Sequence, residues 1–170
     1  KNQGASATYY ASFGWYGGLE VMAPTEGYML SVAEESDLIY PNFGAGDALS
    51  REKVAKELPA TISDWQVDYH DYEFNGHITM SIASREDSHG DYIAVFSGDE
   101  CRGVAERMYF PFGDSYMYSV MVYSNEIAGE ELTFRYYDSA NGEIVEYGET
   151  IDFTADMIMG DGFNTFGLSR

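Results

Sequence analysis

The sequence predicts an all-β fold, an antiparallel β-sandwich of the immunoglobulin-like or jelly-roll-like kind. From Asp64 onward, apolar and polar residues alternate with the period of two that strands require. Turn residues divide this region into seven short segments, and no helical pattern lies between them. The 170 residues include 15 tyrosines and 18 glycines, a composition typical of β-rich chains with tight turns.

Residues 1–40 form a small N-terminal β unit in this interpretation. Gly17-Gly18, Pro24 to Gly27 and Ser36-Asp37 provide turn chemistry. We expect short strands between these turns, at residues 8–13, 19–22, 28–32 and 38–40. Because so few short strands cannot build an independent core, the unit is expected to be incomplete and to pack on another part of the protein.

Residues 41–63 are predicted to be a linker. The stretch "PNFGAGDAL" is loop-like, and "SREKVAKEL" carries charged residues at helical spacing. Ser50 is a good N-cap and Pro59 a helix terminator, so we expect one short helix between them.

Residues 64–170 form the sandwich module itself. Its expected strands lie at residues 73–82, 92–97, 102–110, 116–124, 132–138, 144–147 and 150–154. Asn141-Gly142 is the strongest hairpin signal, because a type I′ turn needs two positive φ angles. Both faces of segment 116–124 are apolar, which predicts a central strand that is covered on both sides.

Alternation in the segment "ELTFRYYD" predicts which side chains reach the core. Leu132, Phe134 and Tyr136 are expected to point inward. The intervening set is expected to face solvent: Thr133, Arg135 and Tyr137.

The formal charge of −20 excludes two classes of partner. Phosphate backbones and anionic membranes are bound by clustered Lys and Arg, and the chain has only nine such residues. No run approaches 18 apolar residues, so we expect no membrane insertion. A strongly acidic surface needs counterions, which calcium or a saline exterior would supply.

Cys101, the single cysteine, cannot form an internal disulfide. A catalytic thiolate needs a neighbouring base, whereas Asp99 and Glu100 beside Cys101 oppose ionisation. We therefore interpret Cys101 as a small residue at the start of a strand and expect no enzyme. His70, His77 and His89 lack the spacing of a zinc site.

Calcium is the cofactor that the acidic turns would bind. Calcium takes six to eight oxygen ligands, which loops rich in Asp, Asn and carbonyl groups provide. The candidate ligands are Asp138, Asn141, Glu143, Asp161 and Asn164. None of these loops fits the EF-hand spacing. The alternative is that they are solvated turns in which Asp side chains cap their own backbone.

Two aromatic groups are candidates for a sugar-binding platform. Trp15 and Tyr16 lie in one group, and Trp65 and Tyr69 lie in the other. Aromatic faces stack on sugar rings while carboxylates accept hydroxyl hydrogen bonds. The alternative is that the two tryptophans are core anchors with polar tips.

The region 62–170 resembles a recurrent extracellular β-sandwich module of large secreted and surface proteins of Bacteroidetes-like and marine bacteria, many of them substrates of type IX secretion. The resemblance is carried by "SDWQVDYHDYEFNGHITMSI", "DYIAVFSGDECRGVAE", "YSVMVYSNEIAGEELTFRYYDS" and "MIMGDGFNTFGL". The segment "GWYGGLEVMAPTEGYMLSVAEESDLIYP" is similar to a small unit that often precedes this module. The resemblance implies an extracellular or bacterial cell-surface location, and it implies no catalytic residue.

These observations lead to one expected function and one alternative. The expected function is a non-catalytic structural or adhesive module, a subunit or repeat of a cell-surface assembly or filament. Unpaired edges in an incomplete N-terminal unit invite strand addition, so other protein chains are expected to join through the N-terminal strand or the sheet edges. The alternative is a carbohydrate-binding module of a secreted polysaccharide-degrading protein, with extracellular glycan as its partner.

Overall fold

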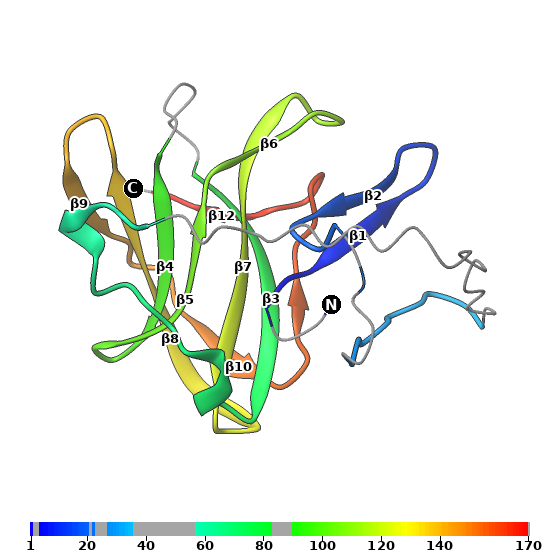
Figure 1. Cartoon of the computed structure of the whole chain (residues 1–170), viewed down its shortest axis with the longest axis horizontal. Helices are drawn as coiled ribbons and strands as arrows, with labels where there is room; N and C mark the ends of the chain where they lie inside the picture. Colours follow the sequence, from blue (N-terminus) through cyan, green and yellow to red (C-terminus); the bar gives the residue numbers. More distant parts are fainter. Residues whose placement is uncertain (2–3, 21, 23–26, 36–56, 83–89, 170) are drawn as a thin grey trace, which may run out of the picture.

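The computed structural model describes residues 1, 4–20, 22, 27–35, 57–82 and 90–169, and it is an all-β sandwich (Figure 1). The two short 3-10 turns are η1 (Ala60–Ile62) and η2 (Tyr69–Asp71). The strands are β1 (Ala7–Tyr10), β2 (Gly14–Gly17), β3 (Phe74–Ile82), β4 (Tyr92–Ser97), β5 (Glu100–Glu106), β6 (Met108–Phe110), β7 (Ser115–Ser124), β8 (Ala128–Asp138), β9 (Glu143–Glu146), β10 (Ile151–Thr154), β11 (Ile158–Met159) and β12 (Phe166–Leu168).

Two sheets form the sandwich. The first has the order β10-β8-β4-β5, and β9 also pairs with β8. The second has the order β11-β3-β7-β6, and β12 also pairs with β3. Strands β11 and β12 run parallel to β3. All other strand pairs described are antiparallel, which confirms the expected pairing for them. The two parallel pairs arise because the chain, after β10, runs along the outer edge of β3 in the same direction as β3.

The period-two pattern located most strands of the sandwich closely. Strand β4 has the predicted bounds, and β3, β7, β9 and β10 begin and end within one residue of the prediction. Strand β8 starts four residues earlier, at Ala128 rather than Leu132. The predicted strand 102–110 is divided into β5 and β6 at Arg107. Strands β11 and β12 were not predicted, because two or three residues are too few to show a period.

The main core lies between the sheets. The predicted inward set on β8 is confirmed, since Leu132, Phe134 and Tyr136 are all at most 3% exposed. These side chains pack with inward residues of β7, namely Tyr118, Val120 and Val122. The other buried members of this cluster are Ile78, Met80, Ile93, Val95, Phe153 and Leu168.

A second cluster covers the outer face of the first sheet. Ile62 and Trp65 pack there against Ala94 and Phe96 of β4. The expectation that Tyr137 faces solvent is wrong, because Tyr137 is buried in this cluster at 8% exposure. The teal segment around η1 and η2 crosses this face of the sheet (Figure 1). Part of the predicted linker, including Ile62, therefore belongs to the folded body.

The run from β5 to β6 joins the two sheets. Strand β5 pairs with β4 of the first sheet, and β6 pairs with β7 of the second. The two sheets meet closely at this seam, where a Cβ on Gly103 would lie 2.2 Å from the carbonyl oxygen of Met121. Only glycine allows two backbones to approach so closely.

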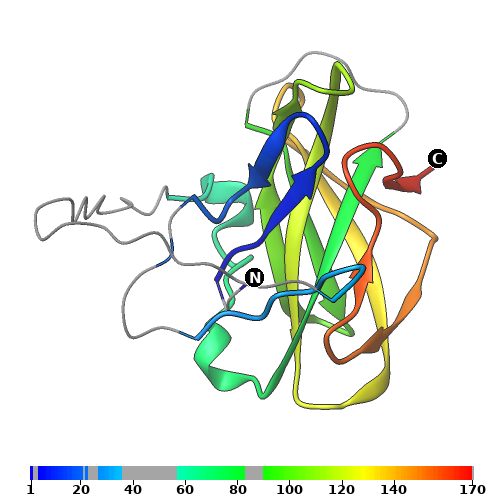
Figure 2. The same ribbon diagram turned by 90° about the vertical axis from the view of Figure 1, so that its right-hand side faces the viewer.

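Residues 7–17 form a hairpin that the sequence did not reveal. The predicted strand 8–13 is wrong at its end, since the chain turns after Tyr10 and returns as β2. Ser12 and Gly14 hold the turn with φ angles of 72° and 93°. Tyr10 and the half-buried Tyr16 pack against Phe110. The hairpin thus lies against β6 and β7 (Figure 2).

The remaining N-terminal predictions have mixed outcomes. No strand forms at residues 19, 20, 22 or 28–32, which are described but irregular, so those two predictions are wrong. The strand predicted at 38–40 and residues 50–56 of the predicted helix lie outside the described residues. Residues 57–59, the end of that helix, are irregular, and η1 begins directly after Pro59.

The predicted hairpin at Asn141-Gly142 is present, but its turn is different. Asp138 pairs with Glu143, so the loop has four residues rather than two. Gly142 has a φ of 68°, whereas Asn141 is not among the residues with positive φ. The turn is therefore not type I′, which would need positive φ at both central positions.

Candidate functional site

Four aromatic side chains on and beside the N-terminal hairpin are exposed to solvent. Tyr9 is 59% exposed, Phe13 55%, Trp15 64% and Phe163 54%. Tyr9 and Trp15 contact each other, whereas Phe13 and Phe163 pack against Phe112 and Tyr10. We call the pair Tyr9 and Trp15 the exposed aromatic surface. Large exposed apolar groups of this kind mark interaction sites when they gather in one region.

The geometry of the hairpin explains this exposure. Tyr9 and Trp15 are direct cross-strand partners, and their rings meet edge to face with centroids 5.5 Å apart. Because side chains alternate across a strand, neighbouring Tyr10 and Tyr16 point the opposite way, toward Phe110. One face of the hairpin is thus attached to the sandwich while the other presents Tyr9 and Trp15 to solvent.

The hairpin is fixed to a loop near the other end of the chain. The Tyr10 hydroxyl accepts a hydrogen bond of 2.7 Å from the Gly162 amide. Phe163 lies against Tyr10 at 5.4 Å between ring centroids. A two-stranded hairpin is only marginally stable alone, so these contacts position the exposed aromatic surface.

The second predicted aromatic group divides between core and surface. Trp65 is 2% exposed and contacts Phe96 edge to face, so its ring is a core anchor and offers no open stacking face. Tyr69 is 36% exposed and stacks with Tyr123 at 6.2 Å. The structure does not bring Trp65 and Tyr69 together with Trp15 into one platform.

The predicted calcium loops use their aspartates to cap their own backbone. Oδ1 of Asp138 accepts hydrogen bonds from the Ala140 and Asn141 amides, and Oδ2 accepts one from the Asn141 side chain. Oδ1 of Asp161 accepts from the Phe163 and Asn164 amides, at 2.7 and 2.9 Å.

The two loops lie at different places in the fold, and Glu143 and Asn164 are exposed. Within the described part of the chain, no group of three or more His, Cys, Asp or Glu side chains is arranged to hold a metal ion. The calcium assignment stays a prediction that rests on the loop composition.

Cys101 is buried within the second cluster at 7% exposure. Burial raises the pKa of its thiol to about 11, so the thiol is protonated at neutral pH. The sulfur donates a weak hydrogen bond to the Gly103 carbonyl. These surroundings are those of an inert structural cysteine.

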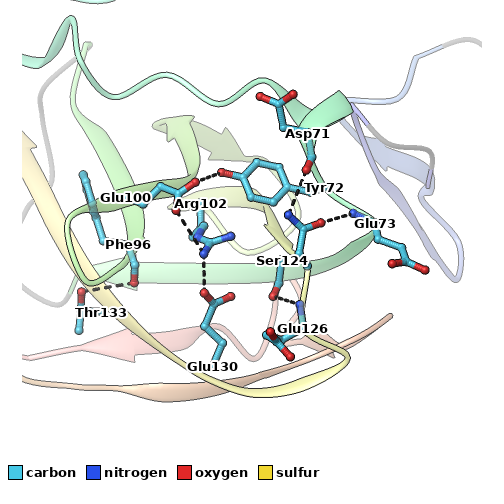
Figure 3. A network of polar contacts seen from close by, with 11 residues as sticks. Asp71, Tyr72, Glu73, Phe96, Glu100, Arg102, Ser124, Glu126, Glu130 and Thr133 are labelled. Atoms are coloured by element: carbon cyan, nitrogen blue, oxygen red, sulfur yellow. Dashed lines mark hydrogen bonds and ion pairs between the residues drawn. The ribbon is translucent and has the colours of Figure 1, made fainter.

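A β-bulge beside Cys101 redirects Arg102. Cys101 pairs with Phe96 and Gly103 pairs with Val95, so Arg102 is the extra residue on β5. Its guanidinium contacts Glu130 Oε1 at 2.5 Å and Glu100 Oε2 at 3.4 Å (Figure 3).

The network around Arg102 attaches the segment that contains η2, just before β3, to the sandwich. Tyr72 donates a hydrogen bond to Glu100, and its ring lies 5.0 Å from the Arg102 guanidinium carbon. Burial and the bond to Glu100 raise the pKa of Tyr72 to about 12. The amide of Asn125 bridges Asp71 and Glu73 on the approach to β3 (Figure 3).

A second polar network is buried at the start of β4, and sequence reasoning missed it. The Asp91 carboxylate is 0% exposed and forms an ion pair with Arg107 at 3.5 Å. It also accepts hydrogen bonds from the Tyr136 hydroxyl at 2.6 Å and from Ser139. The signal for this network was weak, because 29 acids make any single aspartate inconspicuous.

Comparisons of the chain with protein families, with curated proteins and with solved structures found no match. No described helix has the length and apolar character needed to cross a bilayer.

Proposed function

We propose that this chain is a non-catalytic, extracellular structural or adhesive module of a bacterial cell-surface assembly, and that it binds other protein chains through the exposed aromatic surface. The observation that carries the proposal is that Tyr9 and Trp15 face solvent on a hairpin whose opposite face is firmly attached. An extracellular location is supported by the acidic charge of −20 and by the resemblance of residues 62–170.

Sedimentation or light scattering at high protein concentration with calcium tests this assembly. We expect self-association that is weakened by Trp15→Ala and lost when residues 1–12 are removed. Ile127→Ala is the matched control, because Ile127 is 67% exposed at the β7–β8 turn, away from the hairpin. Monomeric behaviour of both the intact and the shortened chain would refute assembly through this unit.

Carbohydrate binding is the second candidate function. It is supported by the indole of Trp15, which is 64% exposed. On a glycan array, saturable binding that disappears in Trp15→Ala would favour this function over protein assembly. Trp65→Ala is not a useful probe of a sugar platform, because Trp65 is a core residue whose loss destabilises the fold.

Calcium binding by the loops around Asp138 and Asp161 remains part of the proposal. Binding to the native state alone stabilises it, so millimolar calcium is expected to raise the melting temperature relative to chelator by several degrees. Asp161→Asn should remove part of the difference. Equal melting temperatures in calcium and in chelator would eliminate calcium as a ligand.

A further inference from the structure

The attached face of the N-terminal hairpin has an apolar cluster of its own. Two members of this cluster, Tyr10 and Tyr16, come from the hairpin. The others come from β6, the turn after it and β7, and they are Met108, Phe110, Phe112 and Met117. As far as the structure describes them, the main core and the second cluster include none of these residues. The hairpin is therefore attached through a contact that is separate from the cores of the sandwich.

Tyr10 lies at the centre of this contact. Its ring centroid is 5.1 Å from that of Phe110 and 5.9 Å from that of Phe112. Its hydroxyl accepts a hydrogen bond of 2.7 Å from the Gly162 amide (Figure 2). On the other strand of the hairpin, Tyr16 meets the same two phenylalanine rings at 5.5 and 5.6 Å. We call Tyr10 and Tyr16 the plug, and Phe110, Phe112 and Gly162 the socket.

The socket has a shape that suits this plug. A Cβ on Gly162 would lie 2.4 Å from Cζ of Phe110, so only glycine lets the backbone pass this ring and offer its amide to Tyr10. Phe13, in the turn of the hairpin, adds a stacked contact with Phe112 at 4.4 Å. Ring contacts and a directional hydrogen bond together make the socket specific for this hairpin.

The plug and the socket belong to distant parts of the sequence. Tyr10 and Gly162 are 152 positions apart, and the Tyr16 hydroxyl donates to the carbonyl of Tyr109, 93 positions away. Within this chain, the hairpin is joined to the sandwich by the residues between Gly17 and η1. Fully extended, residues 36–56 alone would span roughly 70 Å. The covalent connection is therefore long enough for the hairpin of one chain to reach the socket of another.

We propose that the socket also accepts the plug of a second copy of this chain, so that neighbouring chains exchange their N-terminal hairpins. A second copy is the partner that fits, because each contact of an exchanged hairpin is one that the chain already forms within itself. Reciprocal exchange closes a dimer, whereas one-way exchange leaves a plug and a socket at opposite ends and extends a filament. The inference rests on the proposed assembly, names its partner, and adds the attached face of the hairpin to the surfaces that join the chains.

Closure within one chain competes with this exchange. A plug that is linked to its own socket has an effective concentration on the order of millimolar. Intact chains are thus expected to exchange hairpins only where their local concentration reaches this range, as in a dense surface array. A pair of variants, one without a plug and the other without a socket, removes the competition and lets exchange occur in dilute solution.

Sedimentation of two mixed full-length variants tests the proposal. Tyr10→Ala/Tyr16→Ala lacks the plug and keeps the socket, whereas Phe112→Asp keeps the plug and places a charge in the socket. At about 100 µM, roughly tenfold below the effective concentration, we expect each variant alone to stay monomeric. Their equimolar mixture should form a complex of about 38 kDa, twice the 19.0 kDa of one chain.

A second socket variant reaches the same end by a different route. Gly162→Leu blocks the socket because its side chain overlaps the ring of Phe110. Mixed with Tyr10→Ala/Tyr16→Ala, it should form the same 38 kDa complex, twice the mass of one chain. Circular dichroism checks that each variant keeps the sandwich, whose main core contains none of the substituted residues.

The matched control, Tyr9→Ala/Trp15→Ala, removes two aromatic side chains from the opposite face of the same two strands. This variant keeps its plug in its own socket, so its mixture with Phe112→Asp should stay monomeric. Trp15→Ala added to Phe112→Asp should leave the complex with the plug variant intact, because Trp15 is not part of the plug.

The outcomes separate hairpin exchange from assembly through the exposed aromatic surface. Loss of the complex when Trp15→Ala is added would assign the contact to the exposed aromatic surface and overturn hairpin exchange. Monomers in both complementing mixtures, or an equal amount of complex in the control mixture, would overturn it as well.

Discussion

Replacing Asp91 should destabilise the sandwich more than any surface substitution. In Asp91→Ala, Arg107 keeps its charge with only 3% of its side chain exposed and loses its carboxylate partner. The Tyr136 hydroxyl and the Ser139 amide and hydroxyl lose their acceptor as well. Removing one partner of a buried ion pair costs about 3–5 kcal/mol, a large part of the roughly 5–15 kcal/mol that stabilises a domain.

Urea unfolding followed by tryptophan fluorescence measures this loss. With a slope of about 2 kcal/mol/M, a loss of about 4 kcal/mol lowers the urea midpoint by about 2 M. Asp99→Ala is the control, because the fully exposed Asp99 approaches Arg135 only at 3.8 Å, and its midpoint should be unchanged. The double variant Asp91→Ala/Arg107→Met should lose less than the sum of the two single variants, since no uncompensated charge remains.

A midpoint for Asp91→Ala within about 0.3 M of the wild type would refute this reasoning, because it would correspond to less than about 1 kcal/mol. Additive effects in the double variant would show that Asp91 and Arg107 are not energetically coupled.

Three further predictions concern the seam, the thiol and the buried histidine. Gly103→Ala should cost at least about 1–3 kcal/mol in urea unfolding, because its Cβ would overlap Met121 O at 2.2 Å, while Gly148→Ala, with no atom within 4 Å, should be neutral. Cys101 should react with iodoacetamide at pH 8 roughly a hundredfold more slowly in the folded than in the unfolded chain, since its pKa is raised from 9.0 to about 11; equal rates would contradict this. Burial lowers the pKa of His77 from 6.5 in the unfolded chain to about 4 in the folded chain. Between pH 6.5 and pH 4 the unfolded state therefore binds more protons than the folded state, and the stability that neutral His77 contributes is lost as the pH falls through this range. Comparing urea midpoints at pH 7 and pH 4.5, His77→Gln should lose less stability than the wild type, and an identical loss would exclude this contribution.

The sequence predicted the sandwich well because its strands are long enough to show alternation. Strand β4 and the inward residues Leu132, Phe134 and Tyr136 were identified by period alone. Tyr137 was misplaced because alternation separates the two faces of a strand without showing whether the outer face is covered. The cover comes from Ile62 and Trp65, which lie in a segment without strand periodicity.

The candidate site was less predictable for a related reason. Trp15 and Trp65 are the same residue type, yet one is 64% exposed and the other 2%. The exposure of Trp15 depends on its pairing with Tyr9 in the hairpin. That hairpin depends on a turn through Ser12, which the sequence pattern did not predict. Asp138 and Asp161 cap the backbone of their own turns, as the alternative to calcium binding had predicted.

The pairing of β3 has a consequence for the order in which the chain can fold. Strand β3 opens the sandwich in sequence, yet its outer edge is occupied by β11 and β12, which lie between residues 158 and 168. While the chain is being synthesised, that edge stays accessible to other strands until residues 158–168 have emerged, and such edges are sites of aggregation. Contacts between distant parts of a chain also form slowly. The second sheet is therefore expected to close only after residue 168 has emerged, and shortening the chain before Ile158 should yield an aggregating product instead of a smaller sandwich.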